Sequence, residues 1–204
     1  MKIRYINKND VTIVAQMKLD HWQNVYRGMV DDEYLDKLTL EKMITEVEIY
    51  VDPFSKVISG LHERFAPENK ETIDNISLLL EQIKIYALVV ESEDSEIVGF
   101  CTFSSRRIME TSEIKFNGYD YQIHEIYVAP KYRKKGNGKK LIDFAFERIN
   151  HLNENKILLM AHIQNKNAID FYMNIGGTII GNSEIELGDE KYPQIVIGFN
   201  LEDF

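Results

Sequence analysis

The order strand, glycine turn, helix in residues 120–152 is the feature that most constrains the fold of this chain. The strand is expected over DYQIHEIYVAP, which ends at Pro130, a residue that cannot donate to a central β-ladder. The turn RKKGNG follows and contains Gly136 and Gly138. The next segment, GKKLIDFAFERINHL, has apolar residues at the spacings of one helical stripe. These residues are Leu141, Ile142, Ala145, Phe146 and Ile149.

Helical patterns fill the first part of the chain, and β-rich runs dominate the rest. KIRYI predicts a first strand, and DVTIVAQMKLDHWQNVYRG predicts a helix. Residues 31–50 and 72–86 predict two further helices. YALVVES and EIVGFCTFSS predict a hairpin joined by the turn EDSE. A strand at KILLMAHI, a helix at NKNAIDFYMNIG and a final strand at YPQIVIGFNL complete a mixed α/β sandwich around one sheet.

Composition excludes several classes of protein. The 204 residues carry 33 acidic and 24 basic side chains, a net charge of −9, which argues against general binding of nucleic acid. The longest apolar runs are far shorter than the roughly 20 residues that cross a bilayer. The N-terminus lacks the apolar segment of a signal peptide, and the single Cys101 cannot form an internal disulfide. We therefore expect a cytoplasmic protein that does not enter a membrane.

The glycine turn carries a local excess of positive charge in an acidic chain. A turn of this kind exposes backbone N–H groups at a helix N-terminus, where the helix dipole adds partial positive charge. Glycine lets a phosphate approach that backbone closely. The residues alone leave two interpretations open: a pyrophosphate site, or a solvated basic turn whose glycines end elements. The P-loop and dinucleotide-binding patterns are both absent.

Residues 133–138, Arg-Lys-Lys-Gly-Asn-Gly, resemble the Arg/Gln-x-x-Gly-x-Gly/Ala motif of the GCN5-related N-acetyltransferase (GNAT) superfamily. The flanking HEIYVAPKY and GKKLIDFAFERI, the downstream NKNAIDFYMNIGG and the upstream WQNVYRGMVDDEYLDKL are similar to further segments of that family. The likeness covers residues 1–54 and 86–200. It implies the GNAT fold, a central mixed, mostly antiparallel twisted sheet with helices on both faces. We expect a single domain over 1–204, with a helical insertion around 55–85.

The resemblance implies an acetyltransferase that moves the acetyl group of acetyl-CoA to a primary amine of a small molecule. An aminoglycoside, a polyamine and an amino-acid derivative are the candidate acceptors, and the acidic composition favours a cationic one. The alternatives are a non-catalytic acetyl-CoA-binding sensor, a protein or peptide N-acetyltransferase, and a binder of another phosphate. A homodimer is left open.

The resemblance also assigns the residues that hold acetyl-CoA. Backbone amides of the glycine turn would hold its pyrophosphate, and the preceding strand would pair with its pantetheine arm beside a bulge. The turn residues are Arg133, Lys134, Lys135, Gly136, Asn137, Gly138 and Lys139, and the strand residues are Ile126, Tyr127 and Val128. The Val128 amide is the expected oxyanion donor. Asn165 matches a polar contact to the CoA arm, and it also suits a helix N-cap.

Two residues are expected to do the chemistry. Tyr172 matches the family's general acid, which protonates the CoA sulfur, although it also fits a core aromatic position. Glu125 is the candidate base, directly or through water, and a salt bridge is the structural alternative. One branch of the family, which acetylates ribosomal-protein N-termini, has a glutamate where this chain has Met160, and this difference argues against that activity. His162 on the same strand is a reserve base.

The first helices supply the candidate acceptor-side residues Trp22, Tyr26 and Tyr34, although Trp22 fits core packing equally well. The five histidines show no metal-binding spacing, so we expect no metal site.

Overall fold

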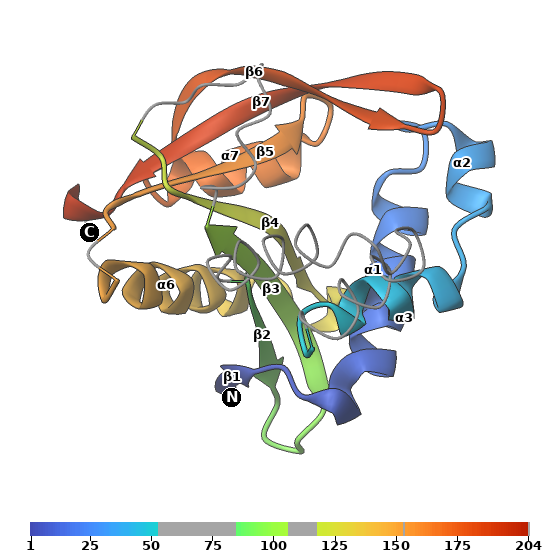
Figure 1. The fold of residues 1–204 in the computed structure, drawn as a ribbon, viewed down its shortest axis with the longest axis horizontal. Coiled ribbons are helices and arrows are strands. Elements are labelled where there is room, and N and C mark those ends of the chain that lie inside the picture. The colour runs from blue at the N-terminus through green and yellow to red at the C-terminus, as the bar shows by residue number, and fades with distance from the viewer. Residues whose placement is uncertain (53–84, 106–117, 153, 204) are drawn as a thin grey trace, which may run out of the picture.

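The described residues of the protein form one seven-stranded sheet with helices on both faces (Figure 1). The computed structural model describes residues 1–52, 85–105, 118–152 and 154–203. The strand order is β1-β2-β3-β4-β5-β7-β6. Strands β4 and β5 pair in parallel, and the other neighbours pair antiparallel. The predicted mixed, mostly antiparallel sheet is confirmed.

The elements follow one another as the sequence pattern indicates, with short 3-10 turns between some of them. The strands are β1 (Lys2–Tyr5), β2 (Ile85–Glu91), β3 (Ile97–Ser105), β4 (Tyr121–Val128), β5 (Lys156–His162), β6 (Thr178–Leu187) and β7 (Glu190–Asn200). The helices are α1 (Val11–Val25), α2 (Asp32–Asp36), α3 (Leu40–Glu48), α6 (Asn137–Asn150) and α7 (Lys166–Asn174).

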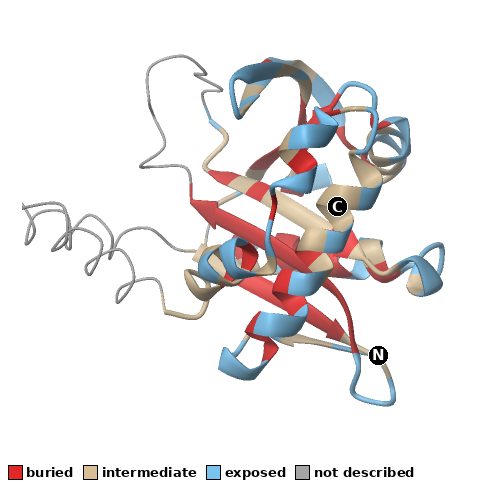
Figure 2. Cartoon of the chain, turned by 90° about the vertical axis from the view of Figure 1, so that its right-hand side faces the viewer, coloured by how far each residue is buried: buried red, intermediate tan, exposed pale blue. Residues whose placement is uncertain are grey.

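Two hydrophobic clusters, one on each face, hold the helices to the sheet. Successive strand residues point to opposite faces, so the neighbours Leu88 and Val89 belong to different clusters. Leu141 of α6 packs in the cluster of Leu88. Val14 of α1 and Met43 of α3 pack in the cluster of Val89. The buried residues accordingly run along the central strands and the inner sides of the helices (Figure 2).

The structure corrects three predictions about elements. Residues 31–50 form two helices, because Asp31 caps α2 and Thr39 caps α3 with hydrogen bonds to backbone N–H groups. The helix predicted over 72–86 is wrong at its end, where Ile85 and Tyr86 begin β2. Its other residues, and the insertion proposed around 55–85 up to residue 84, lie outside the described residues. Strand β6 was not predicted.

Strand β6 forms a long hairpin with β7, and this hairpin reaches α2 (Figure 1). Gly188 in its turn has a φ of +65°, and a Cβ there would lie 3.4 Å from the Tyr34 ring. The Tyr192 hydroxyl accepts a hydrogen bond of 2.9 Å from the backbone N–H of Asp31. The hairpin therefore lies against the segment that follows α1.

Candidate active site

Strand β4 separates from β5 halfway along its length. In the described part of the sheet their pairing ends at Ile123 opposite Leu159, whereas β4 continues to Val128. On its other side β4 stays paired with β3, but the register shifts so that Glu125 faces Thr102 and Ile123 faces Phe103. The additional residue is His124, and such a bulge bends the strand and increases its twist. The bulge explains why β4 leaves β5 at this point.

The separated edge of β4 presents backbone groups toward the β5 side. Ala129 donates its N–H to the Val98 oxygen at 2.9 Å. Hydrogen-bonded and non-hydrogen-bonded pairs alternate in an antiparallel ladder, so Tyr127 bonds to β3 while the N–H groups of Ile126 and Val128 point away from β3. These two donors suit an extended ligand with carbonyl groups.

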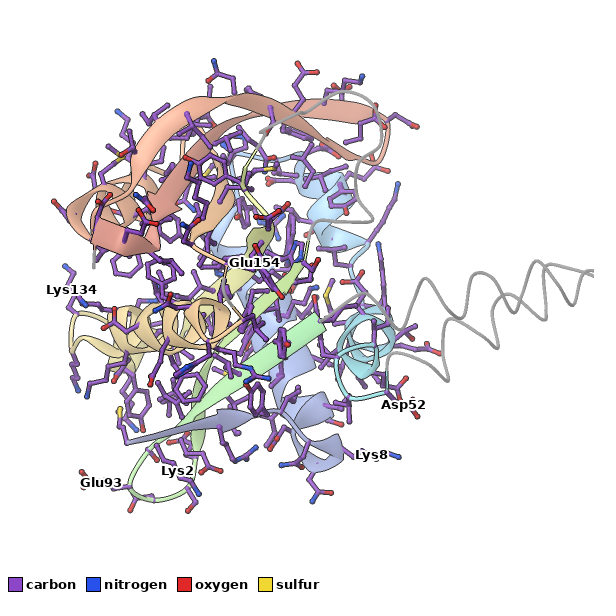
Figure 3. The ribbon with its side chains drawn as sticks, turned by 60° about the vertical axis from the view of Figure 1, so that its left-hand side comes forward. Lys2, Lys8, Asp52, Glu93, Lys134 and Glu154 are labelled. Atoms are coloured by element: carbon purple, nitrogen blue, oxygen red, sulfur yellow. The ribbon has the colours of Figure 1, made fainter. Side chains whose placement is uncertain are left out.

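The glycine turn places a second set of donors beside that edge. Lys134 has a φ of +58° and Gly136 a φ of +79°, both left-handed. The buried Asn137 side chain donates to the Tyr132 oxygen at 2.9 Å, which fixes the turn where α6 begins. Lys134 projects outward beside this end of the helix (Figure 3). A helix N-terminus with exposed lysines is a favourable place for an anion.

Arg133 links the turn to the strand. Its Nε donates to the Val128 oxygen at 2.7 Å, and its guanidinium carbon lies 5.4 Å from the centre of the Tyr127 ring. Of the lysines nearby, Lys139 pairs with Asp143 at 2.7 Å and Lys135 lies 5.8 Å from the Tyr132 ring centre. The Lys139 charge is therefore partly compensated within α6.

Gly138 brings α7 next to the turn. A Cβ at Gly138 would lie 3.3 Å from the tip of the Phe171 ring, so the absence of a side chain lets the first turn of α6 pack closely on α7. Tyr172, the next residue, is buried in the core cluster on this face. Burial, followed by Tyr26 and Cys101, raises the pKa of the Tyr172 hydroxyl, which is therefore protonated at neutral pH.

Asn165 caps α7 and reaches across to α1. Its side chain accepts from the Ala168 N–H at 3.3 Å, which is the N-cap role that the sequence offered as an alternative to a contact with the CoA arm. It also lies close enough to the Tyr26 side chain, at the end of α1, to lower the pKa of that hydroxyl, although burial raises the pKa overall. Asn165, Tyr26 and Tyr172 thus meet beside the place where β4 and β5 separate.

Glu125 forms an ion pair, the structural alternative that the sequence left open, with a partner that the sequence did not identify. Its Oε2 lies 3.0 Å from Nζ of Lys18, which also lies 2.8 Å from Oε2 of Glu46. Burial alone would lower the pKa of Lys18, but the charges of Glu125 and Glu46 outweigh it and raise the pKa. One signal was available: Lys18 follows Val14 by four residues, so a lysine stands in the apolar stripe of α1.

Three histidines lie near these groups. His21 stands edge-on to Tyr127, 4.9 Å between ring centres, and burial with the charge of Arg133 lowers its pKa to about 4. His124 Nε2 lies 2.7 Å from the Ser104 hydroxyl. His162 is buried, and its Nδ1 accepts the Gln164 N–H at 3.2 Å. In the neutral ring, Nε2 of His162 therefore carries the proton.

The acceptor-side candidates lie on the α1 face of the sheet. Trp22 stacks on Tyr26, with 4.8 Å between ring centres, and packs against the cluster on that face. Tyr34 lies close enough to Glu46 and Lys18 for their charges to affect the pKa of its hydroxyl, which burial raises. Tyr26 and Tyr34 therefore flank the charged group, whereas Trp22 supports Tyr26.

The sequence profile of the Acetyltransferase (GNAT) family matches residues 46–176. The chain belongs to this family. The chain is also similar to a curated enzyme, the L-methionine sulfoximine/L-methionine sulfone acetyltransferase of Salmonella typhimurium strain LT2. The two sequences are 24% identical over 116 residues. That match spans 54% of this chain and 64% of the relative, less than two thirds of its length.

Solved structures share the GNAT architecture. The PaiA N-acetyltransferase of Thermoplasma acidophilum, solved in complex with coenzyme A, superimposes with a TM-score of 0.59, 18% identity and coverage of 98% of both chains. The ribosomal-protein-alanine N-acetyltransferase of Brucella melitensis gives a TM-score of 0.62 and 16% identity, over 98% of this chain and 100% of that one. At these identities the likeness establishes the fold, and it confirms the fold predicted from the sequence.

The described residues of this GNAT protein show neither a membrane-spanning helix nor a metal-binding cluster. No helix among them combines the length and apolar character needed to cross a membrane. No group of three or more His, Cys, Asp or Glu side chains in those residues is placed to hold a metal ion.

Proposed function

We propose that this GNAT protein transfers the acetyl group of acetyl-CoA to a primary amine of a small molecule. The observation that carries the proposal is the separation of β4 from β5 after Ile123. It leaves the N–H groups of Ile126 and Val128 pointing away from β3, next to the basic glycine turn. One end of an extended anionic ligand would meet the turn, and its other end would run along β4.

The chain's own groups fit acetyl-CoA on this path. The backbone of Lys134 to Lys139 would hold the pyrophosphate at the start of α6. The backbone N–H groups of Ile126 and Val128 would hold the pantetheine arm, with Asn165 as a further polar contact, whereas the Tyr127 backbone is engaged by β3. The co-substrate supplies an acetyl group as a thioester. The coenzyme A complex of the Thermoplasma structure, which shares the fold, supports this choice of ligand.

Three groups would then assist transfer. The Val128 N–H donates to the carbonyl oxygen, where negative charge develops. The Tyr172 hydroxyl is protonated at neutral pH, since the ordinary tyrosine pKa of about 10 is raised further by burial, and it can give a proton to the departing sulfur, which leaves as a basic thiolate. Glu125 takes the proton of the acceptor ammonium, directly or through water. His162 is the weaker candidate for this step, because its Nδ1 already accepts the Gln164 N–H.

The acceptor would bind on the α1 face, between Tyr26, Tyr34 and Glu125. The pair Glu46 and Glu125 faces a single ammonium, that of Lys18, so a cationic amine suits the remaining negative charge. The likeness to an enzyme named for L-methionine sulfoximine and L-methionine sulfone makes amino-acid derivatives the first acceptors to test, before polyamines and aminoglycosides. The homodimer and the cytoplasmic location stay predictions.

Release of free thiol from acetyl-CoA tests the proposal. The wild-type protein is assayed against amino-acid derivatives, polyamines and aminoglycosides, and acetylated product is confirmed by mass spectrometry. Amine-dependent thiol release with a matching acetylated product supports the proposal. Micromolar binding of acetyl-CoA without turnover on any acceptor would contradict it and favour the non-catalytic sensor instead.

A further inference from the structure

Lys18 lies between two carboxylates that come from different elements. Its Nζ is 2.8 Å from Oε2 of Glu46 on α3 and 3.0 Å from Oε2 of Glu125 on β4. Only 9% of the Lys18 side chain is exposed, against 20% for Glu125 and 37% for Glu46. An ammonium so enclosed is held in place by charge, because a buried ion without partners is strongly disfavoured.

Among the described residues, the other groups that face Glu125 are uncharged at neutral pH. Burial, and then the charge of Glu125 itself, raise the pKa values of Tyr26, Tyr50 and the Cys101 thiol. Burial and the charge of Lys18 lower the pKa of His124 to about 4, and Thr102, opposite Glu125 on β3, cannot ionise. Lys18 thus supplies the positive charge, and Glu46 the second negative charge, in the described surroundings of Glu125.

The two oxygens of Glu125 are not equivalent. Oε2 is enclosed and lies at ion-pair distance from Lys18, without the alignment of a hydrogen bond to any described group. The side chain is nevertheless 20% exposed, and Oε1 is not among the enclosed atoms without a partner, so we infer that Oε1 is the oxygen that an acceptor can reach. The ion pair therefore fixes which oxygen faces the site.

We propose that Lys18 is a positioning residue, which holds Oε2 of Glu125 inward and balances its charge so that Oε1 receives the acceptor's proton. In that step an N–H bond of the acceptor ammonium breaks, its electron pair stays on nitrogen, and an O–H bond forms at Oε1. Lys18 remains protonated, and its charge favours return of the new carboxyl proton to water. The proton-transfer part of this inference rests on the proposed function, whereas the charge relationship does not.

The arrangement predicts that replacing Lys18 and replacing Glu46 shift the protonation midpoint of Glu125 in opposite directions. Replacing Lys18 by Met leaves two carboxylates facing each other, and like charges favour protonation. Glu46→Gln removes the second carboxylate, so the Lys18 charge acts on Glu125 alone and opposes protonation of Glu125. Lys18→Arg keeps the charge. Lys37→Met is the matched control, because it removes an exposed lysine from an ion pair of 2.7 Å with Glu33.

Carbon-13 NMR of the side-chain carboxyl groups of the full chain, titrated with acid without ligand, measures this relationship. The Glu125 signal is assigned by its loss in Glu125→Gln. Lys18→Met should move the protonation midpoint of that signal up by about one pH unit, a tenfold change in proton affinity. Glu46→Gln should move it down, and Lys18→Arg and Lys37→Met should leave it in place. A folded Lys18→Met protein with an unmoved midpoint overturns the inference. If that variant does not fold, Glu46→Gln decides, and an unmoved or raised midpoint overturns it.

Kinetics separate this inference from the proposed function. With an amine acceptor that the enzyme acetylates, the acidic limb of the profile of kcat/KM against pH should move to higher pH in Lys18→Met. It should keep its wild-type position in Lys18→Arg. An active Lys18→Met enzyme with the wild-type limb overturns the positioning role and leaves the acetyltransferase intact. A wild-type protein that acetylates no amine overturns the proposed function, and the NMR titration still decides the charge relationship.

Discussion

Arg133 Nε donates to the backbone oxygen of Val128 at 2.7 Å, five residues earlier in the chain. This bond closes the segment between β4 and α6 into a fixed loop. It engages the Val128 oxygen and leaves the Val128 N–H for a ligand. The Arg133 side chain also lies over the Tyr127 ring, so this one arginine connects the glycine turn to both the backbone and a side chain at the end of β4.

Loss of Arg133 should therefore weaken binding of coenzyme A. Arg133→Ala removes a charge-assisted bond and a nearby positive charge, and we expect the Kd to rise about tenfold, or about 1.4 kcal/mol. Isothermal titration calorimetry measures the effect. Arg27→Ala, which removes an arginine paired with Asp36 at 2.8 Å, is the control. Equal losses in both variants would show that only net charge matters.

Tyr172→Phe should lower kcat and leave coenzyme A binding unchanged. The hydroxyl is protonated at neutral pH, as a tyrosine with an ordinary pKa of about 10 also is, and a positioned general acid contributes roughly 10²–10⁴ in rate. We expect a loss within that range at saturating substrate. Tyr86→Phe is the matched control, since Tyr86 is a second tyrosine packed against the same core cluster, where its ring stacks on Phe103. Wild-type turnover in Tyr172→Phe would leave Tyr172 a core aromatic only.

The sequence indicated the local part of the site and missed the part that is distant along the chain. Strand β4, the glycine turn and α6 are contiguous, so their patterns and the motif at Arg133 could be recognised together. Strand β6 was missed because it is half-exposed at the sheet edge, where burial does not enforce alternation. The ion pairs of Lys18 join residues 28 and 107 positions apart, which no local pattern records.

The two glycines of the turn should respond differently to alanine. A Cβ at Gly136 meets no atom within 4 Å, so its cost is the left-handed backbone, ~1–2 kcal/mol. A Cβ at Gly138 presses on Phe171, and overpacking costs ~1–3 kcal/mol. Phe171→Leu should relieve the second cost and leave the first unchanged. Urea unfolding of the single and double variants measures the coupling between Phe171→Leu and each alanine substitution. Equal coupling at positions 136 and 138 would contradict the contact between position 138 and Phe171.

Acid should destabilise the fold between pH 6.5 and about 4. His21 and His124 each have a pKa lowered to about 4 from 6.5 by burial, so the unfolded state binds more protons in this window and stability falls as pH falls. His124→Gln can keep a hydrogen bond to Ser104 and should flatten the curve of Tm against pH. His151→Gln, at an exposed site, should follow the wild type. If the slope of Tm against pH is the same in His124→Gln as in the wild type, protonation of the His124 ring does not destabilise the fold.

Titration of the nitrogen-15-labelled protein with coenzyme A, followed by the backbone amide signals in NMR, tests the account most directly. The ligand is proposed to lie along the free edge of β4 and on the glycine turn. The largest shifts should therefore come from the amides of Ile126 and Val128 and from residues 134–139, with smaller changes in β1. Saturable binding that leaves these amides unmoved and shifts another surface would contradict the assignment of the site.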